Sequence, residues 1–186
     1  MPRRYADLSP CTGAVLDDLD PALIEAYRLE LERRRPGSPQ LRQSTEDLLL
    51  GLGAAVQERR RLRPTLAGIL FFGRDPQHFY PAFSITFMHF AGTSTVGEGP
   101  DDPLYLDNRE IRGASPVLLE SARATVLETL SKRAVMDGFV RQDLFEYPEF
   151  AYREAIVNAV SHRDYALEGS FIQVRLFADR LEVQSP

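Results

Sequence analysis

Three polar side chains near the C-terminal end of the chain are spaced for joint chemistry: Glu154, Asn158 and His162. On an α-helix, steps of four residues place them in one row that rotates by only about 40° per step. An asparagine oxygen can bind Mg²⁺, a hard ion that prefers oxygen ligands, and a glutamate one turn earlier can hold a water of that ion. The same row is typical of an exposed helix face with hydrogen bonds between turns, and spacing alone favours this plainer interpretation.

The segment that carries this row has the pattern of a helix over residues 148–163. Pro148 suits the first turn of a helix, and Glu149 complements the positive end of the helix dipole. The helix also has an apolar stripe that can pack on a core, formed by Phe150, Ala151, Ala155, Ile156, Ala159 and Val160.

A wider set of residues gives a resemblance to a known family. Its most specific strings run from Arg153 to Ala159 and from His162 to Tyr165, and the strings 179–183 and 185–186 follow them. Together with residues 16–20 and 64–76, these strings resemble bacterial transcriptional regulators of the Schlafen AlbA_2 and RecG-like helicase-related family. The resemblance covers nearly the whole chain.

The resemblance implies a nucleotide-binding module of the GHKL class, the fold shared by histidine kinases, gyrase B and heat-shock chaperones of the Hsp90 class. By that match Asn158 is the Mg²⁺ ligand and Glu154 is the candidate general base. His162 and Asp164 belong to the same string and are expected on the cofactor-binding side. The implied cofactors are ATP and Mg²⁺.

The resemblance also implies an order of domains. We expect an α+β architecture in which residues 1–63 form a helical connector and residues 64–186 form an α/β module with a mixed sheet and helices on one face. The sequence stops at Ser185-Pro186 on a strand that runs into a turn signal, so we expect the GHKL-like module to be truncated at its C-terminus. The DNA-binding AlbA_2-type domain is expected upstream of Met1.

The function that this organisation predicts is that of a transcriptional regulator fragment. Its partners are then DNA, through the absent upstream domain, and a nucleotide effector, with a homodimer as a further expectation. The nucleotide module is either sensing or vestigial in this interpretation. Two alternatives stay open: a module that hydrolyses Mg-ATP once residues beyond Pro186 are present, and a non-catalytic scaffold for dimerisation.

Other catalytic interpretations fit the sequence less well. His162-Arg163-Asp164 imitates the catalytic loop of a protein kinase, but Gly169 stands where that loop needs an asparagine. A metal hydrolase would need His78, His89 and His162 to converge without a sequence signature. The sequence has no P-loop, so we do not predict helicase activity.

Composition sets limits on the class of protein. The chain has 186 residues, of which 44% are hydrophobic and 26% charged, enough for an ordinary globular core. No apolar run is long enough to cross a membrane, and the polar N-terminus is unlike a secretory signal, so we expect a cytoplasmic protein. The single cysteine, Cys11, fits a reducing compartment and a passive role.

The charge pattern argues against a chain that is basic throughout. The formal net charge is −5, from 27 acidic and 22 basic residues, and all basic residues except Lys132 are arginines. The most basic stretch is Glu58-Arg59-Arg60-Arg61-Leu62-Arg63. It has two interpretations, a DNA-facing turn and an exposed connection, and the acidic whole favours the connection.

Overall fold

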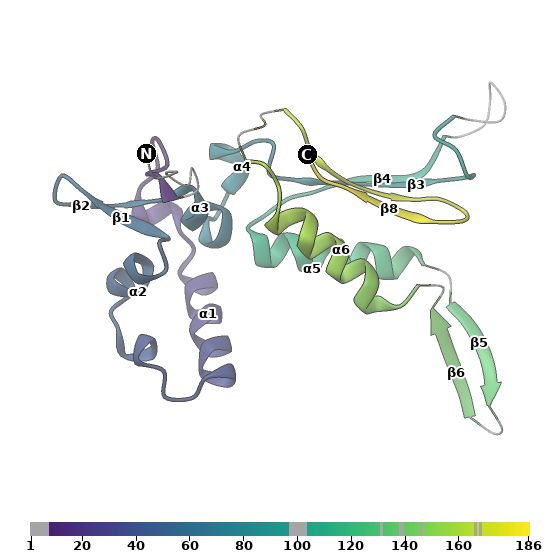
Figure 1. The fold of residues 1–186 in the computed structure, drawn as a ribbon, viewed down its shortest axis with the longest axis horizontal. Helices are drawn as coiled ribbons and strands as arrows, with labels where there is room; N and C mark the ends of the chain where they lie inside the picture. Colours follow the sequence, from purple (N-terminus) through teal and green to yellow (C-terminus); the bar gives the residue numbers. More distant parts are fainter. Residues whose placement is uncertain are drawn as a thin grey trace. The chain divides into compact units, whose positions relative to one another are not determined.

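The structure is a computed structural model that describes residues 8–96, 104–130, 132–137, 140–145, 147–165, 167 and 169–186. The chain divides into two compact units. The first comprises Met1–Phe83 with Gly113–Pro116, and the second comprises Ser84–Arg112 with Val117–Pro186. Figure 1 labels the helices and strands of both units.

The helices of the first unit begin where their capping residues stand. Helix α1, Pro21–Arg34, starts after Asp20, whose carboxylate accepts a hydrogen bond from the Ala22 N–H at 2.9 Å. Helix α2, Thr45–Gly51, starts after Ser44, whose hydroxyl accepts from the Asp47 N–H at 3.1 Å. Asp and Ser are among the residues that helices favour at this position, so local sequence accounts for both starts.

A β-hairpin follows α2. Strand β1, Ala55–Glu58, pairs antiparallel with β2, Arg61–Pro64, so that only Arg59 and Arg60 form the turn. Both turn residues have positive φ values, 44° and 67°. This is the geometry of a type I′ turn, which normally takes Asn-Gly, and a left-handed backbone costs an ordinary residue roughly 1–2 kcal/mol.

The hairpin leads into α3, Leu66–Phe72, and the short helix α4, Pro76–Phe79. Thr65 caps α3: its hydroxyl oxygen accepts a hydrogen bond from the Gly68 N–H at 3.0 Å. Gly68 lies so close to the residue that precedes β1 that a Cβ added there would stand 1.9 Å from the Ala54 carbonyl oxygen. The core of this unit is built from Ala14, Leu19, Ile24, Leu48, Leu49, Ala54, Ala55, Ile69 and Phe72.

The expected boundary at residue 63 falls inside strand β2 and does not divide the structure. Ile69 and Phe72 of α3 belong to the same apolar core as Leu48 and Leu49 of α2, so the segment after residue 63 folds with the segment before it. The first unit therefore extends to Phe83, and it contains a hairpin within the segment expected to be a helical connector.

The second unit is built on a four-stranded mixed sheet in the order β4-β3-β7-β8. Strand β3, Ile85–Phe90, lies antiparallel to β4, Tyr105–Ile111, and parallel to β7, Ile172–Leu176. Strand β8, Leu181–Gln184, closes the order by pairing antiparallel with β7. The parallel pair joins strands more than 80 residues apart in sequence, as Ile85↔Ile172 shows.

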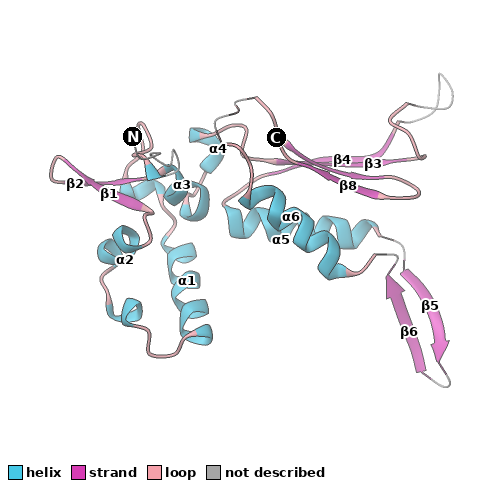
Figure 2. Ribbon diagram, viewed as in Figure 1, coloured by secondary structure: helices cyan, strands magenta, loops and turns pink. Residues whose placement is uncertain are grey.

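Two helices cover one face of this sheet (Figures 1 and 2). They are α5, Ser115–Thr129, and α6, Glu149–Ser161. The core between helices and sheet includes Phe87, Leu118, Ala122, Val126, Ile156, Val160, Ile172, Val174 and Leu176. Between the two helices in sequence stands an antiparallel hairpin of β5, Lys132–Asp137, and β6, Val140–Phe145.

The fold is therefore α+β with a mixed sheet, as the sequence predicts. In the parts of the chain that the structure describes, no helix has the length and apolar character needed to span a membrane.

The close approach at Gly68 gives a stability prediction. Gly68→Ala should lower the free energy of unfolding by about 1–3 kcal/mol or more, because the added methyl group overlaps the Ala54 carbonyl. Gly51→Ala is the matched control: nothing lies within 4 Å of its Cβ position at the end of α2, so it should be neutral or slightly stabilising. Urea unfolding of the full chain measures both. Equal effects of the two changes would show that the packing at Gly68 is not tight.

The arginines at the end of α1 give a pH prediction. Hydrogen bonds from Arg33, which has the larger effect, and from Arg34 lower the pKa of Glu30 from 4.5 to about 2. Because this pKa is lower in the folded chain, the stabilisation is present above pH 4.5 and is lost as the pH falls toward 2. The pair is exposed, so the effect on unfolding is small and the carboxyl itself is the better probe.

Titration of the Glu30 carboxyl by NMR tests this. Arg33→Gln should move the pKa of Glu30 back toward 4.5. Arg35→Gln should leave it unchanged, since Arg35 follows the helix and does not contact Glu30. A pKa of Glu30 that ignores Arg33→Gln would contradict the assignment.

Candidate functional site

Helix α6 is positioned by its apolar face. Tyr152, Ile156, Ala159 and Val160 are buried, and large buried side chains of this kind contribute roughly 1.5–3 kcal/mol each. The first turn is held at the surface by an ion pair between Glu149 and Arg123 of α5, at 2.8 Å. Burial of one face decides which side chains of the helix point to solvent.

Glu154 and Asn158 lie on the solvent side of α6. Both are exposed, and the Asn158 Nδ2 donates a hydrogen bond to Glu154 Oε1 at 3.2 Å. This bond uses the nitrogen of the carboxamide, and the carboxamide oxygen is the atom that a hard cation binds. The two residues can therefore offer Mg²⁺ oxygen ligands from one helix face, with waters and phosphate oxygens as the remaining ligands.

His162 does not continue this row. The helix ends at Ser161 instead of residue 163, and His162 is the C-cap, with φ −109° and ψ 10°. Its backbone N–H still donates to the Asn158 carbonyl at 2.9 Å. The imidazole therefore belongs to the turn that follows α6, and only Glu154 and Asn158 share the helix face.

Asp164 is exposed and lies in the segment after the helix. Its backbone N–H donates to the Pro186 carbonyl at 3.2 Å, and the Ser185 hydroxyl donates to the Ala159 carbonyl at 2.8 Å. These two bonds hold the last residues of the chain against the C-terminal end of α6. Of the four expected site residues, Glu154 and Asn158 are in contact, and His162 and Asp164 stand one turn further on.

The residue between His162 and Asp164 has a structural role that spacing did not reveal. Arg163 is buried, and its guanidinium donates to the carbonyls of Leu167 and Ser170. The Tyr165 hydroxyl donates to the Val160 carbonyl at 2.8 Å. Arg163 and Tyr165 thus fix the path of the chain from α6 toward β7. Arg163 is buried between two exposed residues in a segment that is neither helix nor strand. Such a segment has no regular hydrophobic pattern from which its burial could be predicted.

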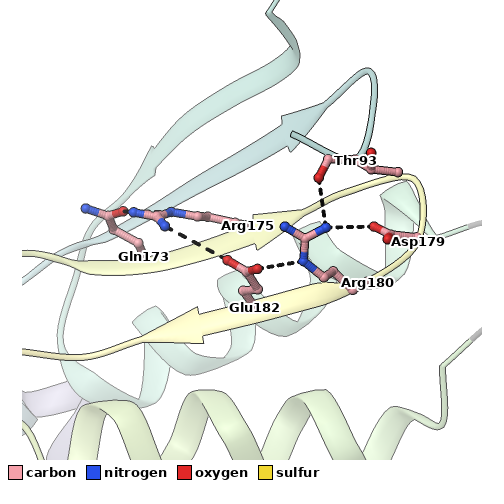
Figure 3. A network of polar contacts seen from close by, with 6 residues as sticks. All are labelled: Thr93, Gln173, Arg175, Asp179, Arg180 and Glu182. Carbon is pink, nitrogen blue, oxygen red and sulfur yellow. Dashed lines mark hydrogen bonds and ion pairs between the residues drawn. The ribbon is translucent and has the colours of Figure 1, made fainter. Parts of the chain in front are cut away.

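A second polar cluster lies on the sheet and is self-contained (Figure 3). Glu182 pairs with Arg180 at 2.6 Å and with Arg175 at 3.9 Å, and Arg180 also pairs with Asp179. The Arg180 guanidinium lies 4.0 Å from the centroid of Phe177. The charges of this cluster already satisfy one another, so it serves the strand pairing of β7 and β8.

The metal-hydrolase interpretation gains no support from the geometry. His78 is in α4 of the first unit, and His89 is on strand β3 of the second. Within the described ranges, no group of three or more His, Cys, Asp or Glu side chains is arranged to hold a metal ion. Cys11 is half-buried, and this burial, with Asp18 nearby, raises the pKa of its thiol, which makes it a weak nucleophile.

Comparison with known proteins concerns mainly the first unit. A family model described as "Domain of unknown function (DUF8451)" matches residues 2–86. No curated protein and no solved structure matches the chain. The matched segment nearly coincides with the stretch Met1–Phe83 of the first unit, so the division of the chain is visible in sequence as well as in structure.

The contrast between buried and exposed polar residues gives a prediction. Arg163→Leu should destabilise the chain by about 2–4 kcal/mol, because the carbonyls of Leu167 and Ser170 lose their donor. Asn158→Ala removes only an exposed contact and should change stability by no more than about 0.5 kcal/mol.

Thermal and urea unfolding of the full chain measure both changes. A large loss of stability in Asn158→Ala would mean that this side chain is structural, and a small loss in Arg163→Leu would contradict its assigned role in the segment after α6.

Proposed function

We propose that the second unit is part of a nucleotide-binding module that takes Mg-ATP as an effector in a DNA-associated transcriptional regulator. The class of module is that of histidine kinases, gyrase B and the Hsp90 chaperones, which the sequence strings around Glu154 and Asn158 resemble. The regulator's own DNA-binding domain is proposed to precede this chain. The first unit then connects that domain to the nucleotide module.

One observation carries the proposal. The Glu154 carboxylate and the Asn158 carboxamide meet at 3.2 Å on the exposed side of a helix whose other side is anchored in a core. An anchored helix holds the two oxygen-bearing groups in fixed relative positions, which a metal site requires. Mg²⁺ typically takes one or two protein ligands and completes its shell with waters and phosphate oxygens.

The position of Pro186 gives further support. Its carbonyl accepts from the Asp164 N–H, and the adjacent Ser185 is bonded to Ala159 in the last turn of α6. Residues that the resemblance places after Pro186 would therefore begin within about one helical turn of Asn158. Such residues are proposed to supply the adenine and phosphate contacts that complete the site.

Calorimetric titration with Mg-ATP tests the proposal, on this chain and on a longer natural chain that continues past Pro186. The longer chain should bind, and Asn158→Ala should weaken Mg-dependent binding about tenfold or more, because a metal ligand is lost. Asn108→Ala is the matched control, since Asn108 is an exposed asparagine on strand β4 and has no place in the site. Absence of ATP binding in the longer chain, or equal effects of the two changes, would refute the proposal.

A phosphate-release assay distinguishes ATP that is only bound as an effector from ATP that is hydrolysed as a substrate. If ATP is only sensed, the longer chain should bind it without turnover above the uncatalysed rate. The hydrolytic alternative predicts turnover that Glu154→Gln lowers by about 10²–10⁴-fold with little change in ATP affinity, because a general base acts on the reaction and not on binding. A dimerisation scaffold would self-associate, and it would show neither ATP binding in the calorimetric titration nor phosphate release.

A further inference from the structure

We propose that the β1–β2 hairpin of the first unit contacts the phosphates of duplex DNA. Its tip carries three consecutive arginines: Arg59 and Arg60 form the turn, and Arg61 begins β2. All three are exposed. This contact would be additional to any DNA-binding domain upstream, and it does not depend on nucleotide binding by the second unit.

The three charges at the tip have no ion-pair partner in the part of the chain that the structure describes. Among the residues that the structure describes, no carboxylate oxygen lies within 4.0 Å of the Arg59, Arg60 or Arg61 guanidinium. Elsewhere in the same unit arginines are paired, as Arg33 is with Glu30. The one acidic residue of the hairpin, Glu58, is engaged by Arg63 at 3.8 Å, so the tip keeps its positive charge.

The hairpin is a firm support for these charges. The Arg63 guanidinium donates to the Ala14 carbonyl at 3.1 Å, and the Cys11 N–H donates to the Pro64 carbonyl at 2.8 Å. The Thr65 hydroxyl donates to the Gly53 carbonyl at 2.7 Å at the base of both strands. A supported ribbon keeps its tip residues in place and lowers the entropy lost when they bind.

The turn itself indicates a use for arginine. A two-residue turn with positive φ at both positions strongly prefers Asn-Gly, and a pair of arginines there stores backbone strain. Strain of this kind concentrates at functional sites. The strain is explained if arginine is present at these two positions for the function of its guanidinium group, although it is unfavourable for the turn conformation.

The shape and chemistry of the tip favour DNA over other acidic partners. A two-stranded ribbon fits the major groove of B-DNA, whereas the deep and narrow major groove of RNA excludes it. A protein partner would need apolar anchors, but Val56 and Leu62, the apolar residues nearest the turn, are half-buried in the hairpin. The guanidinium fork matches phosphate oxygens in pairs.

A hollow of about 420 Å³ lies beside the hairpin and is lined by Arg60 and Arg61 together with Asp17 and Glu46. Its carboxylates oppose deep entry of a polyanion. The proposed contact is therefore made by the tip and not by the hollow: the tip enters the major groove and binds the phosphates that border it, without sequence preference.

The sharpest test replaces the turn by the residues that its geometry prefers. Arg59→Asn with Arg60→Gly removes two charges and relieves the strain, so the full chain should melt at an equal or higher temperature. Its affinity for a short duplex DNA, measured by fluorescence anisotropy, should fall about tenfold or more at low salt. The slope of log affinity against log salt should become shallower by about 2, because two phosphate contacts are lost.

Two controls make the result specific. Arg33→Gln with Arg34→Gln removes the same charge from another exposed site of the first unit, where Glu30 already pairs with both arginines, and should leave DNA affinity nearly unchanged. Arg59→Lys with Arg60→Lys keeps the charge and should retain most of the affinity. The proposal is overturned if the parent chain does not bind DNA, if both charge-removing pairs weaken it equally, or if duplex RNA or polyglutamate binds as well as DNA.

Discussion

The burial of one face of α6 against the mixed sheet is the constraint on which the second unit depends. Ile156 and Val160 are buried in that core, so Glu154 and Asn158 on the other side must face solvent. The same packing brings the end of β8 to the last turn of the helix, where Ser185 bonds to Ala159. The geometry of the candidate site is thus a consequence of hydrophobic packing, and the polar groups add little to the stability that positions them.

Local sequence accounts for where the helices of the first unit begin. Asp20, Ser44 and Thr65 are caps in the structure because a cap depends on a side chain and on backbone groups two or three residues away. Pairing across long separations was not predictable: nothing near Ile85 indicates that it lies beside Ile172. The hairpin inside the expected helical connector was missed because its strands are only four residues long and its turn holds Arg-Arg in place of Asn-Gly.

In the candidate site, too, features that depend on local helix geometry were predictable and features that depend on the folded chain were not. The spacing of Glu154 and Asn158 gave their shared face, since helix geometry relates residues four apart. The burial of Arg163 depends on carbonyls at Leu167 and Ser170 that only the folded segment brings near, so the sequence around it does not predict that burial. Arginines in this chain therefore take their roles from their neighbours: Arg163 is buried, Arg33 is paired, and those at the hairpin tip have no carboxylate partner among the described residues.

The central claim is that a metal-bound nucleotide sits at Glu154 and Asn158. The most direct test replaces Mg²⁺ by paramagnetic Mn²⁺ and records NMR spectra of the isotope-labelled longer chain with and without ATP. The account predicts ATP-dependent broadening that is strongest for the amides and side chains around Asn158 on α6. Broadening that is independent of ATP, or centred on another part of the chain, would contradict it.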